Sequence, residues 1–272
     1  MSTSKGKLTI TMDCWHSYKD ARDLFFKSID RYWPDLNYPM IIACNKPLDG
    51  ENYKGKVIVC DESLTDSKRH LEALKHTETE FTLLIVEDGL ITAPVNNKRL
   101  DEIVEYMEKN HIDFCKLTNT PNKRGKKIKD LPFAKKINRR QPYGINYLCG
   151  IYRKSFLMEL LDSDCKDSWE IEEHLLKDAL SEPHGYYDNK ILVTDNPLHV
   201  RFCIEQGKWS YWAKKTIAKK GYCIESSRKS WSIWHDFFAR SKHFASSFFP
   251  IRLRFGLKKV LSKIGFKFTS KQ

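Results

Sequence analysis

The segment Phe81–Val86 (FTLLIV) constrains the fold of this chain more than any other feature. Its residues are nearly all apolar, which is typical of a central β-strand covered on both faces. The segment ends abruptly at Glu87-Asp88-Gly89, where polar residues and a glycine suit the end of a strand. Strands of this kind occur mainly in the parallel sheets of α/β proteins, where helices cover both faces of the sheet.

The neighbouring segments alternate between strand-like and helix-like patterns. We expect further strands at residues 8–12, 40–44, 56–60, 112–117 and 147–152. Helical spacing of apolar residues predicts helices at 20–33, around Leu71 and Leu74, and at 98–109, 154–161, 169–180 and 210–220. The order predicts an α/β domain with a mainly parallel sheet, whose ligands bind beyond the carboxyl ends of the strands. Asp13, Glu87 and Asp88 follow two such ends.

The charge of the chain is concentrated in two segments. The net charge is +12 over 272 residues. Residues 226–272 contain eleven Lys or Arg and one acid, and residues 123–140 contain nine and one, for net charges of +10 and +8. The rest of the chain therefore has a net charge of −6. Residues 123–140 also contain Gly125 and Pro132, so we expect a loop there.

Two groups of acidic residues are candidates for chemistry. Glu87 and Asp88 at a strand end provide hard oxygen ligands for a divalent cation that binds a diphosphate, or they form an ordinary polar turn. Glu170 and Glu172 lie at the start of a predicted helix, about 200° apart around its axis, so that only one can face a cleft. One acid of this second pair could act as a general base. Alternatively, both are ordinary acids in a first helical turn, where the helix dipole favours them.

The end of the first strand supplies a third candidate. Asp13-Cys14-Trp15-His16-Ser17 combines an aromatic ring with polar groups that could hold a nucleotide. The chain contains neither the GxGxxG pattern of dinucleotide-binding proteins nor the P-loop pattern. Nucleotide binding would therefore have to use a different arrangement.

Taken together, these segments resemble a family of bacterial glycosyltransferases with the GT-A fold that act in surface-polysaccharide (lipopolysaccharide or capsule) synthesis. The resemblance covers roughly residues 8–221. It lies in short motifs that follow one another in order: the strand ending in Asp13-Cys14-Trp15-His16-Ser17-Tyr18, Phe25-Phe26, Tyr32-Trp33-Pro34-Asp35, Tyr38-Pro39, Leu71–Leu74, Thr79-Glu80-Phe81, Glu87-Asp88-Gly89 in place of a DxD-like acidic motif, Trp169-Glu170-Ile171-Glu172 and Gly207-Lys208-Trp209.

The resemblance implies a domain over 1–225, with a Rossmann-like nucleotide-sugar half at about 1–120 and an acceptor half at 121–225. It implies that a sugar moves from a nucleotide donor to a hydroxyl of a lipid-linked glycan or lipopolysaccharide. Carried over by position, Asp88 and Glu87 would bind Mn²⁺ or Mg²⁺. Glu172 would be the general base of an inverting transfer, with Glu170 as second choice, and the donor would lie near Asp13, Ser17, Glu87, Asp88 and Trp169. The family commonly has a paired-Asp motif followed by an aromatic residue, and the Glu87-Asp88-Gly89 of this chain departs from it.

Residues 226–272 form a basic tail rich in aromatic residues. Apolar residues recur near helical spacing from Ile251 to Phe268, with cations at the same spacing on a different side. Such an amphipathic basic helix favours an anionic membrane surface, although a helix that packs on its own domain would show a similar pattern. The residues expected to contact membrane or acceptor are Lys208, Trp231, Trp234, Arg252, Lys259 and Lys263.

The location and the rival functions follow from these features. No run of about 18 apolar residues predicts a transmembrane helix, and the N-terminus lacks a signal peptide, so we expect a cytoplasmic protein on the inner face of the cell membrane. Nucleic acid is not an expected partner, because the acidic body would repel phosphate backbones. The rivals are a non-catalytic membrane scaffold and a nucleotidyltransferase of related fold. The second would need Gly and Arg near the first strand, and residues 13–20 contain neither.

Overall fold

The computed structural model describes residues 6–48, 53–118, 125–137, 147, 149–162, 165–181, 191–194, 196–224 and 226–237. Over these residues a nine-stranded sheet has the order β3-β2-β1-β4-β9-β6-β10-β8-β7. The bounds of its strands are β1 Leu8–Cys14, β2 Met40–Cys44, β3 Lys56–Val59, β4 Phe81–Val86, β6 Phe114–Lys116, β7 Lys126–Lys127, β8 Ala134–Lys136, β9 Gly150–Arg153 and β10 Ile191–Thr194.

The sheet is mainly parallel, as the sequence predicted. Strands β3, β2, β1 and β4 form parallel neighbours, and β6 and β10 form another parallel pair. Strand β9 lies between β4 and β6 and is antiparallel to both, so β4 and β6 still run in the same direction. Strand β8 is also reversed with respect to β10.

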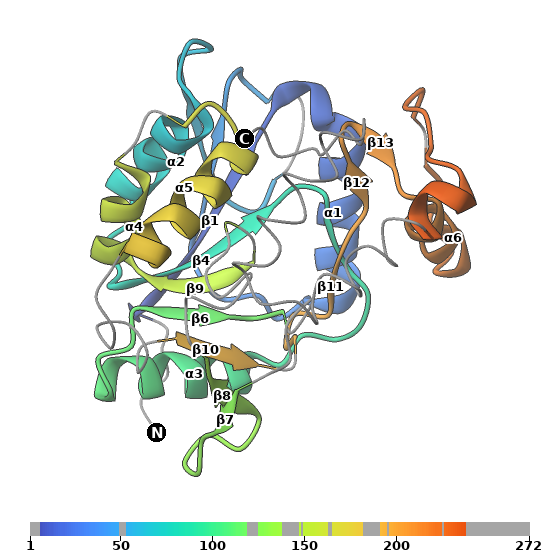
Figure 1. Ribbon diagram of the computed structural model, residues 1–272. Helices are drawn as coiled ribbons and strands as arrows, with labels where there is room; N and C mark the ends of the chain where they lie inside the picture. The colour runs from blue at the N-terminus through green and yellow to red at the C-terminus, as the bar shows by residue number, and fades with distance from the viewer. Residues whose placement is uncertain are drawn as a thin grey trace, which may run out of the picture.

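Helices cover both faces of this sheet, in three layers (Figure 1). Strand β1 is buried along its whole length; Leu8, Ile10 and Met12 pack in the core with α1 and α3, whereas Thr11 contacts His70 of α2 on the other face. The helices and the remaining strands are α1 Lys19–Tyr32, α2 Asp66–Lys75, α3 Asn97–Lys109, α4 Lys154–Leu161, α5 Ser168–Ser181, α6 Tyr211–Lys219, β5 Gly89–Ile91, β11 Val200–Phe202, β12 Ile204–Glu205 and β13 Lys208–Trp209. The first core combines α1 and α3 with one face of the sheet, and the second combines α2, α4 and α5 with the other.

Polar groups on the α2 face of β1 are hydrogen-bonded. The Thr11 hydroxyl lies 2.9 Å from the Thr82 hydroxyl and 3.1 Å from Nε2 of His70. His70 is fully buried, and its Nδ1 is hydrogen-bonded to the Tyr147 hydroxyl. Burial lowers the pKa of His70 to about 3, so the imidazole is neutral at physiological pH. These side chains tie α2 to the centre of the sheet without burying a charge.

The structure corrects the sequence predictions in two places. Residues 123–140 were expected to be a loop, but their described part contains β7 and β8, which pair antiparallel. No strand was predicted at residues 89–91, but after the turn at Glu87-Asp88 they form β5, which pairs antiparallel with β11. The strands that the sequence did not predict, β5, β7 and β8, are short and lack a long apolar run. They form because of the strands with which they pair, and their own residues do not indicate them.

The first residues of the predicted tail contact the α/β domain. Ser230 forms a parallel bridge with Trp209, and the Arg228 guanidinium makes a bidentate ion pair with Asp20 of α1, with N–O distances of 3.0 and 2.9 Å. The predicted boundary at residue 225 stays a prediction, and residues 238–272 lie outside the described residues. In the part of the chain described here, no helix combines the length and apolar character needed to cross a bilayer.

Candidate functional site

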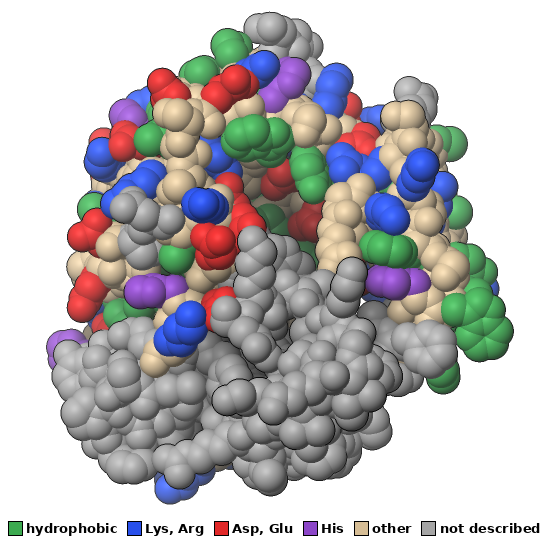
Figure 2. Space-filling model, turned by 45° about the horizontal axis from the view of Figure 1, so that its top comes forward, with side chains coloured by type: hydrophobic (Ala, Val, Ile, Leu, Met, Phe, Trp, Pro, Cys, Tyr) green, Lys and Arg blue, Asp and Glu red, His purple; other side chains and the backbone are tan. Residues whose placement is uncertain are grey.

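The carboxyl ends of β1 and β4 bring the first group of predicted residues together. Asp13 is aligned with Val86 across the parallel pair, so Glu87 and Asp88 begin beside the last residues of β1. Figure 2 looks onto this edge of the sheet and shows a hollow with acidic side chains in its depth. The position agrees with the usual place of ligands in open α/β sheets.

Glu87 is a buried carboxylate, 9% exposed, which faces the end of β1. Its Oε1 accepts a hydrogen bond from the backbone N–H of Trp15 at 3.1 Å. Burial, together with the neighbouring charge of Asp88, raises the pKa of Glu87 to about 8. The side chain is therefore costly to ionise and would gain from a nearby cation.

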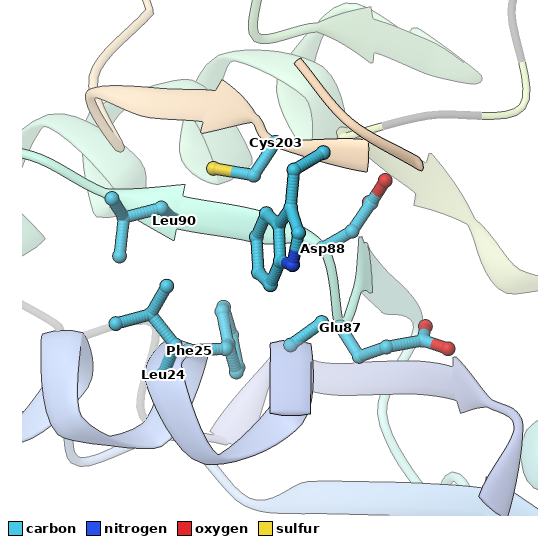
Figure 3. Close-up of a pocket in the computed structure, with 8 residues that line it drawn as sticks. Leu24, Phe25, Glu87, Asp88, Leu90 and Cys203 are labelled. Atoms are coloured by element: carbon cyan, nitrogen blue, oxygen red, sulfur yellow. The ribbon is translucent and has the colours of Figure 1, made fainter. Parts of the chain in front are cut away.

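Asp88 is half-buried, and its backbone C=O accepts the N–H of Cys203 at 2.9 Å. Burial raises the pKa of its carboxyl to about 7, an effect that the N–H of Ile204 and the charge of Arg228 partly oppose. Figure 3 shows the carboxylates of Glu87 and Asp88 pointing in different directions, at the end of a pocket away from Leu24 and Leu90. Both residues lie in the turn between β4 and β5.

The pocket behind these acids is a packing feature. It is too narrow to hold a water molecule, and it is lined by Ala21, Leu24, Phe25, Glu87, Asp88, Leu90, Cys203 and Trp209. Its apolar part belongs to a cluster that joins α1, β5 and α6. A ligand would therefore lie on the open side of the carboxylates and not inside this pocket.

Either Glu87 or Asp88 could bind a divalent cation of the Mg²⁺ or Mn²⁺ type, but not both at once, because their carboxylates point in different directions. One hard carboxylate, costly to ionise because it is buried, matches a cation that takes its remaining ligands from phosphates and water. Among the described residues, no group of three or more His, Cys, Asp or Glu side chains is placed to hold a metal ion. One of these carboxylates would therefore supply a single protein ligand, with phosphate and water oxygens as the others.

Asp13 has a partner that the sequence analysis did not identify. Its carboxylate binds Arg69 of α2 in a bidentate ion pair, with N–O distances of 2.6 and 3.0 Å, and both side chains are buried. Arg69 also binds Asp66 at 2.7 Å and lies 4.9 Å from the centre of the Trp15 ring. Its Nη1 is buried without a hydrogen-bond partner. Asp13 thus positions a guanidinium with one unused donor nitrogen at this edge.

Ser17 lies on the surface and does not line the pocket that Glu87 and Asp88 border. It is exposed within the short 3₁₀ helix His16–Tyr18 and borders an open groove of about 720 Å³ between α1 and residues 223–228. Arg228 borders the same groove and lies 4.2 Å from the centre of the Tyr18 ring. The positive charge of Arg228 offsets part of the rise in pKa that burial causes at Asp88. Sequence reasoning missed Arg228 because it assigned all cations of that segment to a membrane.

Glu172 and Glu170 have different environments on α5. Glu172 is half-buried, and burial raises its pKa to about 7, an effect that Lys116 and the backbone N–H of Tyr147 oppose. Lys116 is fully buried at the end of β6, and its burial lowers its pKa to about 8. Glu170 instead accepts the backbone N–H of Lys166 at 2.9 Å and so belongs to the start of the helix.

Strand β9 separates the two halves of the candidate site. Gly150 is aligned with Leu84 of β4 on one side and with Lys116 of β6 on the other. Two strand spacings amount to about 10 Å. The acids after β4 and the Glu172–Lys116 pair therefore lie at the same edge of the sheet, on either side of β9.

The remaining predicted residues belong to two groups. The side chain of Trp169 lies outside the described residues, as do Arg252, Lys259 and Lys263. Lys208, Trp231 and Trp234 are described, and Nζ of Lys208 lies 3.8 Å from the centre of the Trp231 ring. The signals that could have identified Arg69 and Lys116 are weak, because a single cation within an apolar pattern does not reveal its partner.

Comparison with known proteins gives structural similarities but no family assignment. No family model matches the chain, and no curated protein matches it. The chain aligns with residues 1–349 of TarS from S. aureus at 17% identity and a TM-score of 0.47, covering 70% of this chain and 58% of that one. It aligns with a mannosyltransferase from Pyrobaculum calidifontis, solved with GDP-Man and Mn²⁺, at 10% identity and a TM-score of 0.41, covering 74% and 58%. A nucleotidyl transferase from Methanothermobacter aligns at 11% identity and a TM-score of 0.43, covering 89% and 99%.

Proposed function

We propose that the chain is a glycosyltransferase of GT-A type that moves a sugar from a nucleotide-sugar donor to an acceptor hydroxyl. The observation that carries the proposal is the placement of Glu87 and Asp88 at the carboxyl end of a central strand, with pKa values raised to about 8 and 7. Buried carboxyls with raised pKa values, at the edge where α/β sheets bind ligands, are typical of functional sites.

The donor diphosphate would lie on the open side of these acids. Asp88, with Glu87 as the alternative ligand, would hold a divalent cation, which would supply positive charge to the departing diphosphate. Arg69 lies behind this edge in a buried ion pair with Asp13, and would hold the end of β1 in place for the donor. Trp15 lies next to Arg69 and offers an aromatic face for a nucleobase.

Glu172 would act as the general base. Its pKa, raised to about 7, suits proton transfer near neutral pH. The carboxylate takes the proton of the acceptor hydroxyl while the hydroxyl oxygen bonds to the anomeric carbon. The bond from that carbon to the diphosphate oxygen breaks at the same time, and the nucleoside diphosphate leaves with the bonding electrons. Displacement from the opposite side inverts the configuration of the anomeric carbon.

The acceptor would be a lipid-linked glycan or lipopolysaccharide on the inner face of the cell membrane. This part of the proposal rests on the basic, aromatic composition of residues 226–272. It makes the protein a peripheral membrane enzyme of polysaccharide synthesis. The nature of the sugar and of the nucleotide depends on the shape of the pocket around the donor.

The experiment is a transfer assay with Glu172→Gln and Glu170→Gln, which test the two candidate bases against each other. With nucleotide sugars and a lipid-linked acceptor, Glu172→Gln should lower kcat by roughly 10²–10⁴-fold, the usual contribution of a general base. Glu170→Gln should retain most activity, because Glu170 is bound to the backbone at the start of α5. Full activity of Glu172→Gln, or a product that retains the anomeric configuration, would exclude Glu172 as a simple base.

A further inference from the structure

Exposed apolar side chains gather on one part of the molecule. Five large hydrophobic side chains are strongly exposed among the described residues, and four of them belong to residues 211–237. They are Tyr211 at 36%, Ile233 at 42%, Trp234 at 68% and Phe237 at 56% exposure, whereas the fifth, Val59, lies on β3. Single exposed hydrophobic residues are normal, but a cluster of them marks an interaction surface.

This segment is held firmly against α6. The carboxylate of Asp236 is buried and accepts hydrogen bonds from the Ser210 hydroxyl at 2.6 Å and from the backbone N–H of Trp212 at 3.1 Å. Asp236 therefore satisfies donors at the first turn of α6. The exposed side chains of residues 233–237 project from a segment with a defined position.

Aromatic contacts of Trp231 also hold this segment in place. The Trp231 ring stacks on His235, with 3.7 Å between ring centres, and lies 3.8 Å from Nζ of Lys208. Its Nε1–H donates to the carbonyl of Glu205 at 2.9 Å. Lys208 and Trp231, which the sequence assigned to membrane contact, thus fix the position of the neighbouring residues.

The charge around these apolar side chains is positive. Lys214, Lys215, Lys219 and Lys229 are exposed on α6 and on the segment after it. The one described acid of residues 211–237 is Asp236, and its carboxylate is buried, so it contributes little negative surface. Figure 2 shows Lys and Arg beside hydrophobic side chains at the right of the molecule, where α6 lies in Figure 1.

We propose that this surface, the α6 face, docks on an anionic phospholipid bilayer. We define the α6 face as Tyr211, Lys214, Lys215, Ile233, Trp234 and Phe237. Exposed aromatic rings insert at the level of the lipid headgroups, and neighbouring lysines are attracted to anionic lipids. The chain also continues from Phe237 directly into its basic, aromatic residues 238–272.

The inference deepens the proposed function, since it names the part of the folded domain that faces the membrane carrying the acceptor. The α6 face is built on β13 and α6, which share a core cluster with α1 and with Leu90, two residues after Asp88. Docking through this face would therefore fix the orientation of the candidate site relative to the lipid surface. A tail acting alone would leave that orientation free.

Vesicle flotation of the full-length protein tests the α6 face without any catalytic step. We expect binding to vesicles of phosphatidylcholine with phosphatidylglycerol and little binding to phosphatidylcholine alone. The double variant Trp234→Ser/Phe237→Ser should lower the bound fraction by roughly tenfold, because two inserting rings are lost. Val59→Ser, which removes an equally exposed apolar side chain from β3, is the matched control and should bind as the wild type does.

A second variant keeps the test valid if the first folds poorly. Lys214→Glu/Lys215→Glu changes only exposed side chains of α6 and should weaken binding to the anionic vesicles severalfold. Wild-type binding by both double variants would overturn the proposal. A loss of self-association by Trp234→Ser/Phe237→Ser in light scattering, with unchanged vesicle binding, would assign the face to contacts between copies of the chain. Nucleotide binding, measured separately, should be unchanged in all these variants, so failure of the proposed function would be recognised independently.

Discussion

Glu87 and Asp88 are the residues on which the proposed chemistry depends, and their burial has a thermodynamic consequence. Both carboxyls hold protons in the folded protein up to pH values near their raised pKa values of about 8 and 7. In the unfolded chain the same groups lose their protons near pH 4. Between these limits the folded state binds more protons than the unfolded state, so stability falls as pH rises.

Glu87→Gln should therefore stabilise the protein at alkaline pH. Relative to the wild type, we expect a gain on the order of 1–3 kcal/mol on going from pH 5 to pH 8, since the variant no longer ionises at this position. Its amide oxygen can still accept the N–H of Trp15. The measurement is urea unfolding at a series of pH values. Glu105→Gln on the exposed side of α3 is the control, and an equal pH dependence in both variants would contradict the assigned burial.

The sequence predicted the position of single residues where the end of an apolar strand alone determines that position. Glu87 and Asp88 follow a long apolar strand, and Asp13 ends another, so their place at the edge of the sheet was predictable. The positions of Arg69 and Lys116 in the site could not be predicted. Arg69 pairs with Asp13, 56 residues away, and Lys116 lies near Glu172 on a separate helix. Arg228 is separated from its partner Asp20 by 208 residues, and no local pattern indicates such a pairing.

At the level of elements, the position of β9 determines the geometry of the candidate site. It is antiparallel between two parallel strands and separates the acids after β4 from Lys116 at the end of β6. The sequence predicted a strand at 147–152 but neither its direction nor its neighbours. Its direction depends on long-range pairing, whereas β1, β2 and β4 were predicted from their own apolar residues.

Gly150 allows this strand to pack closely. A Cβ at this position would lie 2.7 Å from the Phe114 ring and 3.2 Å from the carbonyl of Cys115. Gly150→Ala should therefore force β9 and β6 apart and destabilise the protein by about 1–3 kcal/mol, as overpacked cores do. Gly6→Ala meets no atom within 4 Å and serves as the control. Thermal unfolding compares the two, and equal midpoints would show that the sheet adapts without cost.

At the level of the whole molecule, the basic net charge and the acidic candidate site belong to different regions. The carboxylates lie at the carboxyl edge of the parallel strands, while exposed lysines surround apolar side chains on the α6 face. The ion pair between Arg228 and Asp20 joins the segment after α6 to α1. The net charge of +12 therefore does not describe the candidate site, whose described side chains include the carboxylates of Glu87 and Asp88.

The central claim is that the carboxyl edge binds a nucleoside diphosphate with the help of Asp88. Isothermal titration of UDP and GDP into the full-length protein, with and without Mn²⁺, tests it most directly, with Asp88→Asn as the variant. The account predicts that at least one of the two nucleotides binds, that Mn²⁺ strengthens binding, and that Asp88→Asn abolishes the effect of Mn²⁺ while the fold is kept. If neither UDP nor GDP binds, or if Mn²⁺ strengthens binding to Asp88→Asn as much as to the wild type, the account is contradicted.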